Sequence, residues 1–317
     1  MTDGMCRSRG GTYPMRRGTP PPIGYFAAAR PAAGAETFGL GLDTVRIRLE
    51  GLDAARAEEL RARYGPFSCN LAPEPGVLRV RVALDDREYF IDPPTSAEFN
   101  PVWLEPEGVR RIRFAGYRAA GWFDTVADEG ELLLARGTYE PEVHAVENFL
   151  RVVVAWRAAE AGGALVHGAS LIWGGRAYLF FGESGAGKST LAAANRRGTV
   201  VSDDLTLVLP SVDREGLDVV GSPFRGTYEA GKPVLGRYPL AAGFRLVKAD
   251  RARVVPVARL VVFGQLVGNL TFVAEAFERR ADRFAAVERA FAAVPLAHLH
   301  FTPDETYWDA IAAAGLA

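Results

Sequence analysis

A glycine-rich segment in the middle of the chain carries the clearest chemical pattern. Residues 182–189 read Gly-Glu-Ser-Gly-Ala-Gly-Lys-Ser, which matches the phosphate-binding pattern G-x-x-x-x-G-K-[ST] in full. The apolar run 177–181 before it has the length of a strand, and residues 189–194 after it are rich in helix formers. A loop in this context points backbone N–H groups and a helix N-terminus at one place, which attracts polyphosphate. The segment therefore predicts a nucleotide site.

The residue types within the loop assign separate tasks. Lys188 supplies a mobile positive charge for the β- and γ-phosphates, and the Ser189 hydroxyl is a ligand for Mg²⁺. No guanine-selecting N-K-x-D segment occurs in the chain, which favours ATP. A glycine-rich turn without a ligand is the alternative, and both flanks together with the Lys-Ser pair disfavour it. The expected nucleotide-binding residues are Gly182, Glu183, Ser184, Gly185, Ala186, Gly187, Lys188, Ser189 and Thr190.

Two acids follow the next strand along the chain. The apolar segment 199–202 is expected to be a strand, and it ends in Asp203 and Asp204. A strand that delivers acids to a sheet edge beside a phosphate-binding loop typically holds Mg²⁺ and water. Two exposed acids that open a turn are the alternative. We expect Asp203 to join Ser189 in binding Mg²⁺.

The elements around the loop must position these groups. Residues 164–173 are extended and include His167, and a Gly174-Gly175 turn joins them to the strand that enters the loop. A long helix is expected over 141–161, with proline at its first position and a glycine pair at its end. A hairpin that feeds such a loop is unusual, because the common nucleotide-binding folds reach it from a parallel β-α-β unit.

Downstream of the acid pair the pattern alternates between strands and helices. Residues 259–263 are expected to be a strand and 274–293 an amphipathic helix, and residues 302–305 resemble a capping box that opens a last helix. His298 and His300 share one face of their strand, but metal binding there needs further ligands. The other expected strands are 205–209, 217–220, 244–247 and 296–301.

The segment before the long helix shows strand patterns and no clustered reactive side chains. Val45, Ile47 and Leu49 alternate with charged residues, residues 53–64 suggest a helix, and 77–84 with 88–91 suggest a hairpin. Three parts are therefore expected: a disordered tail over 1–36, a small β-rich domain over 37–138 and a catalytic domain over 139–317.

Composition limits the functional classes. The chain has 317 residues and a formal net charge of −1, which gives no electrostatic reason to expect nucleic acid as a partner. No apolar stretch reaches the roughly 18–20 residues of a membrane span. Cys6 and Cys69 are the only cysteines, too few for a disulfide framework, so we expect a reduced cytoplasmic location.

The order of these features resembles a known enzyme family. A strand carrying His-Gly at 167–168, a hairpin, the loop 182–189, a short helix and an acid-ended strand are similar to the catalytic domain of HPr kinase/phosphorylase. The similarity extends to shorter bacterial relatives that phosphorylate a serine of a precursor peptide. It implies an α/β fold of the type shared by HPr kinase and phosphoenolpyruvate carboxykinase, with a mixed sheet. The small β-rich α+β domain expected before it from the strand patterns shows no clear likeness to the N-terminal domain of the full-length kinase. The resemblance also implies homo-oligomers.

The resemblance implies catalytic roles by position. Lys188 corresponds to the family's phosphate-binding lysine, His167 to its active-site histidine and Asp204 to the proton acceptor. The family's Glu-x-Arg-Gly stretch appears as Pro223-Phe224-Arg225-Gly226, which lacks the acid but gives Arg225 the position of the arginine. A core histidine and a surface arginine are the alternatives for His167 and Arg225. The expected reaction is transfer of the γ-phosphoryl group of Mg-ATP to a Ser or Thr hydroxyl of a protein or peptide.

Other functions stay open. A small-molecule enzyme that resembles ATP-dependent phosphoenolpyruvate carboxykinase has a related core, but it needs further Lys and His metal ligands. A nucleotide-binding scaffold without transfer is consistent with the missing acid of the Glu-x-Arg-Gly stretch. A transport-type ATPase is disfavoured because no L-S-G-G-Q-like segment is present.

Overall fold

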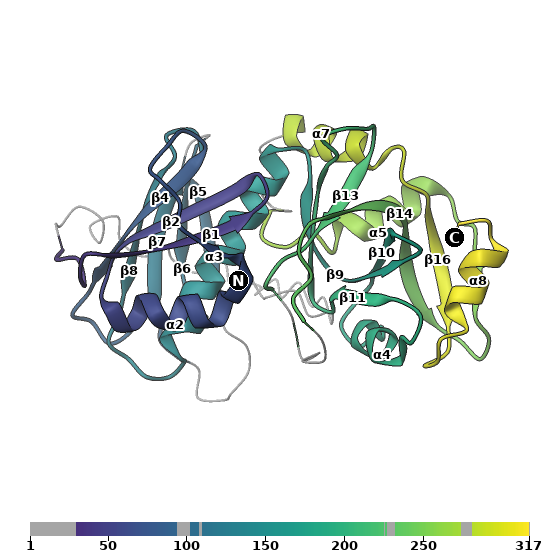
Figure 1. Ribbon diagram of the computed structural model, residues 1–317, viewed down its shortest axis with the longest axis horizontal. Helices are drawn as coiled ribbons and strands as arrows, with labels where there is room; N and C mark the ends of the chain where they lie inside the picture. The colour runs from purple at the N-terminus through teal and green to yellow at the C-terminus, as the bar shows by residue number, and fades with distance from the viewer. Residues whose placement is uncertain are drawn as a thin grey trace, which may run out of the picture. The chain divides into compact units, whose positions relative to one another are not determined.

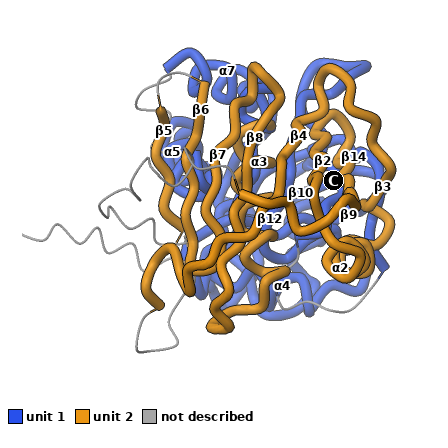
Figure 2. The backbone as a smooth tube through the Cα atoms, turned by 90° about the vertical axis from the view of Figure 1, so that its left-hand side faces the viewer, with its two compact units in different colours: residues 1–12, 158–317 blue, residues 13–157 orange. Residues whose placement is uncertain are grey.

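The computed structural model describes residues 30–93, 102–107, 110–224, 226, 232–273 and 281–316. They divide into an N-terminal unit that ends at Arg157 and a C-terminal unit that begins at Ala158 (Figure 2). This division falls inside a long helix, after the expected boundary at residue 138. Of the expected tail over 1–36, residues 1–29 lie outside the described part of the chain. None of the described helices is both long and apolar enough to cross a membrane.

The described residues of the N-terminal unit form an eight-stranded sheet in the order β3-β1-β2-β4-β8-β7-β6-β5. Its alternating patterns follow the pleat, so that Val45, Ile47 and Leu49 are buried while the charged residues between them are half-exposed. The strands are β1 (Glu36–Leu42), β2 (Val45–Leu52), β3 (Ser68–Cys69), β4 (Val77–Leu84), β5 (Trp103–Glu107), β6 (Arg111–Ala115), β7 (Ala119–Asp124) and β8 (Glu129–Leu134).

Two of the described α-helices accompany this sheet (Figure 1). Helix α2 (Ala54–Tyr64) begins after Asp53, whose carboxylate accepts a hydrogen bond of 2.8 Å from the Arg56 backbone N–H. It runs into a short 3₁₀ turn, η1 (Gly65–Phe67). Helix α3 (Glu142–Glu160) buries Phe149, which makes edge-on contacts with Phe114 and Phe123. The N-terminal unit therefore combines a sheet with helices.

One expected hairpin of this unit is wrong. The pattern predicted that 77–84 and 88–91 pair across Asp85 and Asp86, but residues 88–91 form no strand. Strand β4 instead lies between β2 and β8 and is parallel to both. The Asp85 carboxylate accepts hydrogen bonds from the Arg87 backbone and from the side chains of Arg30 and Arg87. These local bonds hold the chain after β4 in an irregular turn.

The C-terminal unit contains a closed barrel of five described strands. Neighbours pair in the order β10-β9-β12-β13-β14, and a parallel pairing of β14 with β10 closes the ring (Figure 1). Strands β16 and β15 extend the sheet from β14, and β11 pairs with β9. The strands are β9 (Ala164–Trp173), β10 (Arg176–Phe181), β11 (Thr199–Ser202), β12 (Leu205–Pro210), β13 (Leu217–Val220), β14 (Arg237–Lys248), β15 (Arg253–Val255) and β16 (Leu296–Phe301).

The hairpin before the glycine-rich loop is confirmed. Strands β9 and β10 are antiparallel, and Gly174 and Gly175 at their turn both have positive φ angles. The described helices of this unit are α4 (Lys188–Ala194), α5 (Arg259–Val267), α7 (Ala281–Phe291) and α8 (Tyr307–Ala313). Sheets of mixed strand direction together with helices confirm the expected mixed α/β class.

Two expected elements of this unit are corrected. Residues 259–263 were expected to be a strand but belong to helix α5, which buries Val262, Phe263 and Leu266 on one face and leaves Leu260 exposed. A short apolar run does not distinguish a strand from a helix. The last helix begins at Tyr307 and not directly after Thr302, because the Asp304 carboxylate accepts the Thr306 backbone N–H in a turn of its own. Of the expected helix 274–293, residues 274–280 lie outside the described part.

The core behind the glycine-rich loop is aromatic. Phe180 of β10 is fully buried, stacks on Phe244 of β14 and meets Trp308 of α8 edge-on, with ring centroids 5.8 and 6.1 Å apart. The Asn195 side chain joins α4 to α8, because its Oδ1 accepts a hydrogen bond of 3.0 Å from Trp308 Nε1. These contacts fix the strand that enters the loop and the helix that leaves it.

Phe180→Ala removes a ring from the centre of this core. We expect a loss of about 3–5 kcal/mol in the free energy of unfolding, because the neighbouring rings cannot move in to fill the cavity that the substitution leaves. Urea unfolding of the C-terminal unit measures it. Leu260→Ala on α5 is the control, since Leu260 is 79% exposed and its loss should change stability by no more than about 0.5 kcal/mol. Equal effects of the two substitutions would contradict this account.

Candidate functional site

The glycine-rich loop lies between β10 and α4. Gly185 and Gly187 have φ angles of +76° and +104°, a backbone region that other residues adopt at a cost. A Cβ on Gly187 would lie 2.5 Å from Cζ of Phe301, whereas a Cβ on Gly185 would meet no atom within 4 Å. Gly187 is therefore required both by its backbone conformation and by its packing on the end of β16.

Lys188 is buried at the start of α4 and points back into the loop. Its ammonium group donates hydrogen bonds to the carbonyl oxygens of Gly182 and Glu183, at 2.9 and 3.3 Å. Burial lowers the pKa of Lys188, and the nearby Asp204 carboxylate acts in the opposite direction. The loop thus holds a concentrated positive charge close to the acid pair.

The acid pair occupies a break between two strands that both run along β9. Strand β11 pairs with the C-terminal half of β9 and β12 with its N-terminal half, and Asp203 and Asp204 lie between them. The Gly168 backbone N–H donates a hydrogen bond of 2.8 Å to the Asp204 carbonyl. On the other side of β9, Gly168 pairs with Phe181, the last residue before the loop. Pairing through a single strand therefore brings the acids to the loop.

The two acids have different surroundings. The Asp203 side chain is 3% exposed, and its Oδ1 accepts a hydrogen bond of 2.8 Å from the Gly226 backbone N–H. Asp204 is half-buried, and its Oδ1 lies 3.4 Å from Nε2 of His167. A buried acid held by a backbone donor and a more open acid beside a histidine are suited to different tasks.

His167 is a buried and neutral partner of Asp204. Burial and the positive charge of Lys188 lower the pKa of its imidazole to about 4. At neutral pH the ring is uncharged, so a Nε2–H tautomer can donate to the Asp204 carboxylate. The His167 backbone N–H also donates a hydrogen bond of 2.8 Å to the Asn269 carbonyl, which fixes the strand at this point.

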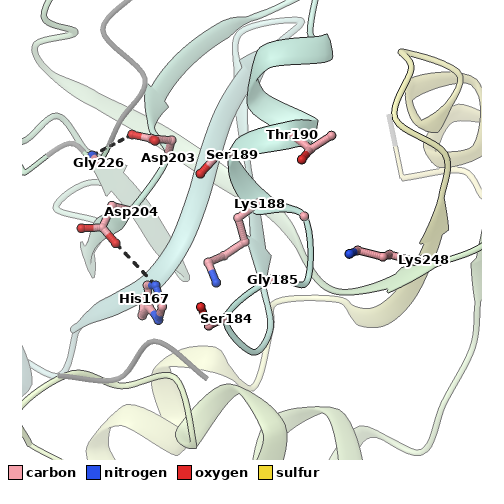
Figure 3. Close-up of a pocket in the computed structure, with 11 residues that line it drawn as sticks. His167, Ser184, Gly185, Lys188, Ser189, Thr190, Asp203, Asp204, Gly226 and Lys248 are labelled. Atoms are coloured by element: carbon pink, nitrogen blue, oxygen red, sulfur yellow. Dashed lines mark hydrogen bonds and ion pairs between the residues drawn. The ribbon is translucent and has the colours of Figure 1, made fainter. Parts of the chain in front are cut away.

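These groups surround one cavity of about 500 Å³ (Figure 3). Asp203, Asp204 and His167 lie on one side of Lys188, and Lys248 projects toward the loop from the opposite side. The predicted residues that line the cavity are Ser184, Gly185, Gly187, Lys188, Ser189, Thr190, Asp203, Asp204 and His167. An ammonium group, hydroxyl groups and carboxylates therefore line one cavity.

The structure also shows which site residues the sequence reasoning missed or misplaced. Of the predicted loop residues, Gly182, Glu183 and Ala186 do not line the cavity; the first two provide the carbonyls that hold Lys188. Arg225 lies outside the described residues. Lys248 and Gly226 line the cavity without having been predicted. Lys248 ends β14, which runs parallel to the strand that enters the loop, and the sequence carries no signal for that pairing.

The oxygen groups in the cavity fit a magnesium ion. The Ser189 hydroxyl and the Asp203 carboxylate line the same cavity, and Mg²⁺ is usually bound by one or two protein oxygens together with substrate phosphates and water. Among the described residues, no group of three or more His, Cys, Asp or Glu side chains is placed to hold a metal ion.

Comparison with known proteins adds no assignment. No model of a known protein family matches the chain, and no curated protein sequence matches it.

The lowered pKa of His167 makes stability depend on pH. Between about pH 4 and 6.5 the unfolded chain binds a proton on this residue that the folded protein does not. The resulting stability is complete above pH 6.5 and is lost as the pH falls toward 4, by on the order of 3 kcal/mol. His167→Gln removes this titration. Urea unfolding across this pH range should give a difference between wild type and variant that grows with pH, and parallel curves would exclude it.

The two loop glycines separate backbone strain from steric overlap. Gly185→Ala should cost about 1–2 kcal/mol through its positive φ alone. Gly187→Ala should cost clearly more, because its methyl group also overlaps Phe301. Urea unfolding of the two variants tests the comparison, and equal losses would show that the Phe301 ring moves aside freely.

Proposed function

We propose that this protein is a Mg-ATP-dependent kinase similar to HPr kinase, which transfers the γ-phosphoryl group to a Ser or Thr hydroxyl of a protein or peptide. The observation that carries the proposal is the cavity in which Lys188 and Ser189 share a wall with Asp203, Asp204 and His167. The barrel with its hairpin before the loop also fits the expected P-loop kinase type. A cytoplasmic location and homo-oligomers belong to the same proposal.

Phosphoryl transfer needs positioning and charge neutralisation more than covalent help from the protein. Lys188 supplies positive charge at the loop, and the backbone N–H groups of the loop bind phosphate oxygens. The hydrogen bonds of Lys188 to the carbonyls of Gly182 and Glu183 keep its ammonium group within the loop. On nucleotide binding, the ammonium group would exchange these carbonyl oxygens for phosphate oxygens. The bound polyphosphate is thereby oriented before the acceptor arrives.

The acid pair divides the remaining work. Ser189 and the buried Asp203 would hold Mg²⁺, which when bound neutralises charge on the β- and γ-phosphates. Asp204, the more open acid, would accept the proton of the incoming hydroxyl as the hydroxyl oxygen attacks the γ-phosphorus. The bond between that phosphorus and the oxygen that bridges it to the β-phosphate would break, and ADP would leave. Asp204 lines the same cavity as Lys188, whose positive charge lies close to its carboxylate.

His167 acts as a positioning residue in this scheme. His167 Nε2 lies 3.4 Å from Asp204 Oδ1, so a neutral Nε2–H tautomer would orient the carboxylate without adding a charge. A charged histidine beside the carboxylate would lower its affinity for the proton of the acceptor hydroxyl. The low pKa of His167 therefore serves the proposed base.

Substitutions at the loop and at the acid separate binding from transfer. Lys188→Ala should abolish measurable ATP binding, because it removes the central cation of the site. Asp204→Asn should retain ATP binding within a few-fold and lower the transfer rate by about 10²–10⁴-fold, the usual contribution of a general base. Calorimetric titration with Mg-ATP and incubation with γ-labelled ATP and the proteins encoded beside this one measure both effects.

The acceptor is identified in the same assay by mass mapping of the labelled residue. Asp213→Asn is the control, because Asp213 is exposed in the turn between β12 and β13 and should leave both binding and transfer unchanged. Full transfer by Asp204→Asn would rule out Asp204 as the base. Tight ATP binding without any labelled product would favour a nucleotide-binding scaffold.

A further inference from the structure

A second hollow of about 370 Å³ lies in the C-terminal unit. Two connections form it, the turn from β14 to β15 and the loop from β16 to α8. Its lining includes Asp250, Arg251 and Ala252 from the first, and Thr302, Asp304 and Thr306 from the second. None of these residues has a task in the proposed transfer step.

This hollow opens at the same sheet edge as the glycine-rich loop. Strands β10, β14 and β16 are neighbours in that order and are mutually parallel. Their carboxyl ends lead into the loop, into Lys248 and Asp250, and into Thr302, and ligands of such sheets bind outside these ends. Because neighbouring strands are about 4.8 Å apart, β16 lies about 10 Å from β10. The contact of Gly187 with Phe301 joins the two places directly.

The loop chemistry gives the bound polyphosphate a direction. In this motif the lysine reaches the β- and γ-phosphates, and the metal that the hydroxyl binds bridges the same two groups. Asp203 and Asp204 therefore mark the γ-phosphate end. The α-phosphate and the nucleoside must extend away from the acids, toward the side from which Lys248 projects (Figure 3).

Lys248 stands between the two hollows. It ends β14, two residues before Asp250, and it lines the first cavity. Its ammonium group makes no hydrogen bond or ion pair with any of the described residues. An exposed cation with no protein partner at this position suits a phosphate oxygen.

The lining of the second hollow suits a nucleoside. Asp304 and Asp309 are already engaged, the first by Thr306 and the second by Arg197. Asp250 and Arg251 have no side-chain partner among the described residues. A carboxylate accepts hydrogen bonds from ribose hydroxyls or a base amino group, and a guanidinium plane stacks on a base.

We propose that the hollow formed by residues 250–252 and 302–310 is the nucleoside subsite, with Lys248 bound to the α-phosphate end of the nucleotide. This inference rests on the proposed function, because it takes the direction of the polyphosphate from the acid pair. It assigns the base and ribose to residues that no motif marks.

A substitution that fills the hollow tests the proposal. Ala252 is half-buried and lines the hollow, so Ala252→Leu should exclude the nucleoside. Calorimetric titration with Mg-ATP and with Mg-tripolyphosphate measures the two parts of the ligand separately. Wild type should bind ATP more tightly than tripolyphosphate. Ala252→Leu should weaken ATP binding about tenfold and leave tripolyphosphate binding unchanged.

Two further variants complete the comparison. Ala313→Leu is the matched control, because Ala313 is exposed on α8 and does not line the hollow; it should bind both ligands as wild type does. Lys248→Gln should weaken both ligands about equally, since it removes a phosphate contact. If Lys248→Gln binds ATP and tripolyphosphate as tightly as wild type does, the direction assigned to the polyphosphate is refuted.

The remaining outcomes each decide the question. Three results would overturn the subsite. Ala252→Leu could bind ATP as tightly as wild type does, or it could lose affinity for ATP and tripolyphosphate equally. Wild type could also bind ATP no more tightly than tripolyphosphate. If the variants show the expected binding affinities but wild type transfers no phosphoryl group, the proposed function is refuted and the subsite stands. If wild type transfers the phosphoryl group but Ala252→Leu binds ATP as tightly as wild type does, the proposed function stands and the subsite is refuted.

Photolabelling tests the subsite in the wild-type protein, without any substitution that could disturb the fold. 8-Azido-ATP with Mg²⁺ should crosslink to peptides that contain residues 249–252 or 302–310, and excess ATP should prevent it. Labelling confined to other peptides would overturn the proposal.

Discussion

The site depends on the pairing of one strand, β9, with partners on both of its edges. At Gly168 the strand faces Phe181 of β10 on one side, and its backbone N–H bonds to the Asp204 carbonyl on the other. The residue before it, His167, therefore lies between the start of the loop and the acid pair. Backbone hydrogen bonds set this geometry more rigidly than any side-chain contact, because a shift of one residue would turn His167 to the opposite face of the sheet.

Burial then sets the charges of the assembled groups. The Asp204 carboxylate opposes the lowering of the Lys188 pKa by burial, whereas His167 stays neutral because protonation would cost both solvation and repulsion from the lysine. The cavity thus presents two carboxylates and one central cation. Without a divalent cation the carboxylates would repel a terminal phosphate a few ångströms away. In the proposed reaction, metal and nucleotide must therefore bind together.

Local pattern predicted the parts of this arrangement that depend on local interactions. The loop, the hairpin before it and the acid-ended strand follow from glycine positions and apolar runs, and the structure brings their side chains to one cavity. Tertiary pairing was out of reach. Residues 88–91 have a strand pattern but lie in a turn held by Asp85, and the apolar run 259–263 packs as a helix. Lys248 escaped notice because only the closing of the barrel places the end of β14 beside the loop.

Barrel closure also explains why the site has two distinct sides. The acids lie between β11 and β12, which both pair with β9, whereas Lys248 ends β14, the strand that pairs with β10 on its other edge. The cavity is therefore negative on the side of the carboxylates and positive at Lys188 and, beyond it, at Lys248 (Figure 3). A ligand with a metal-bridged, reactive end and an anionic tail matches this gradient in one direction only. The same closure that shields the core thus orients the nucleotide in the proposed reaction.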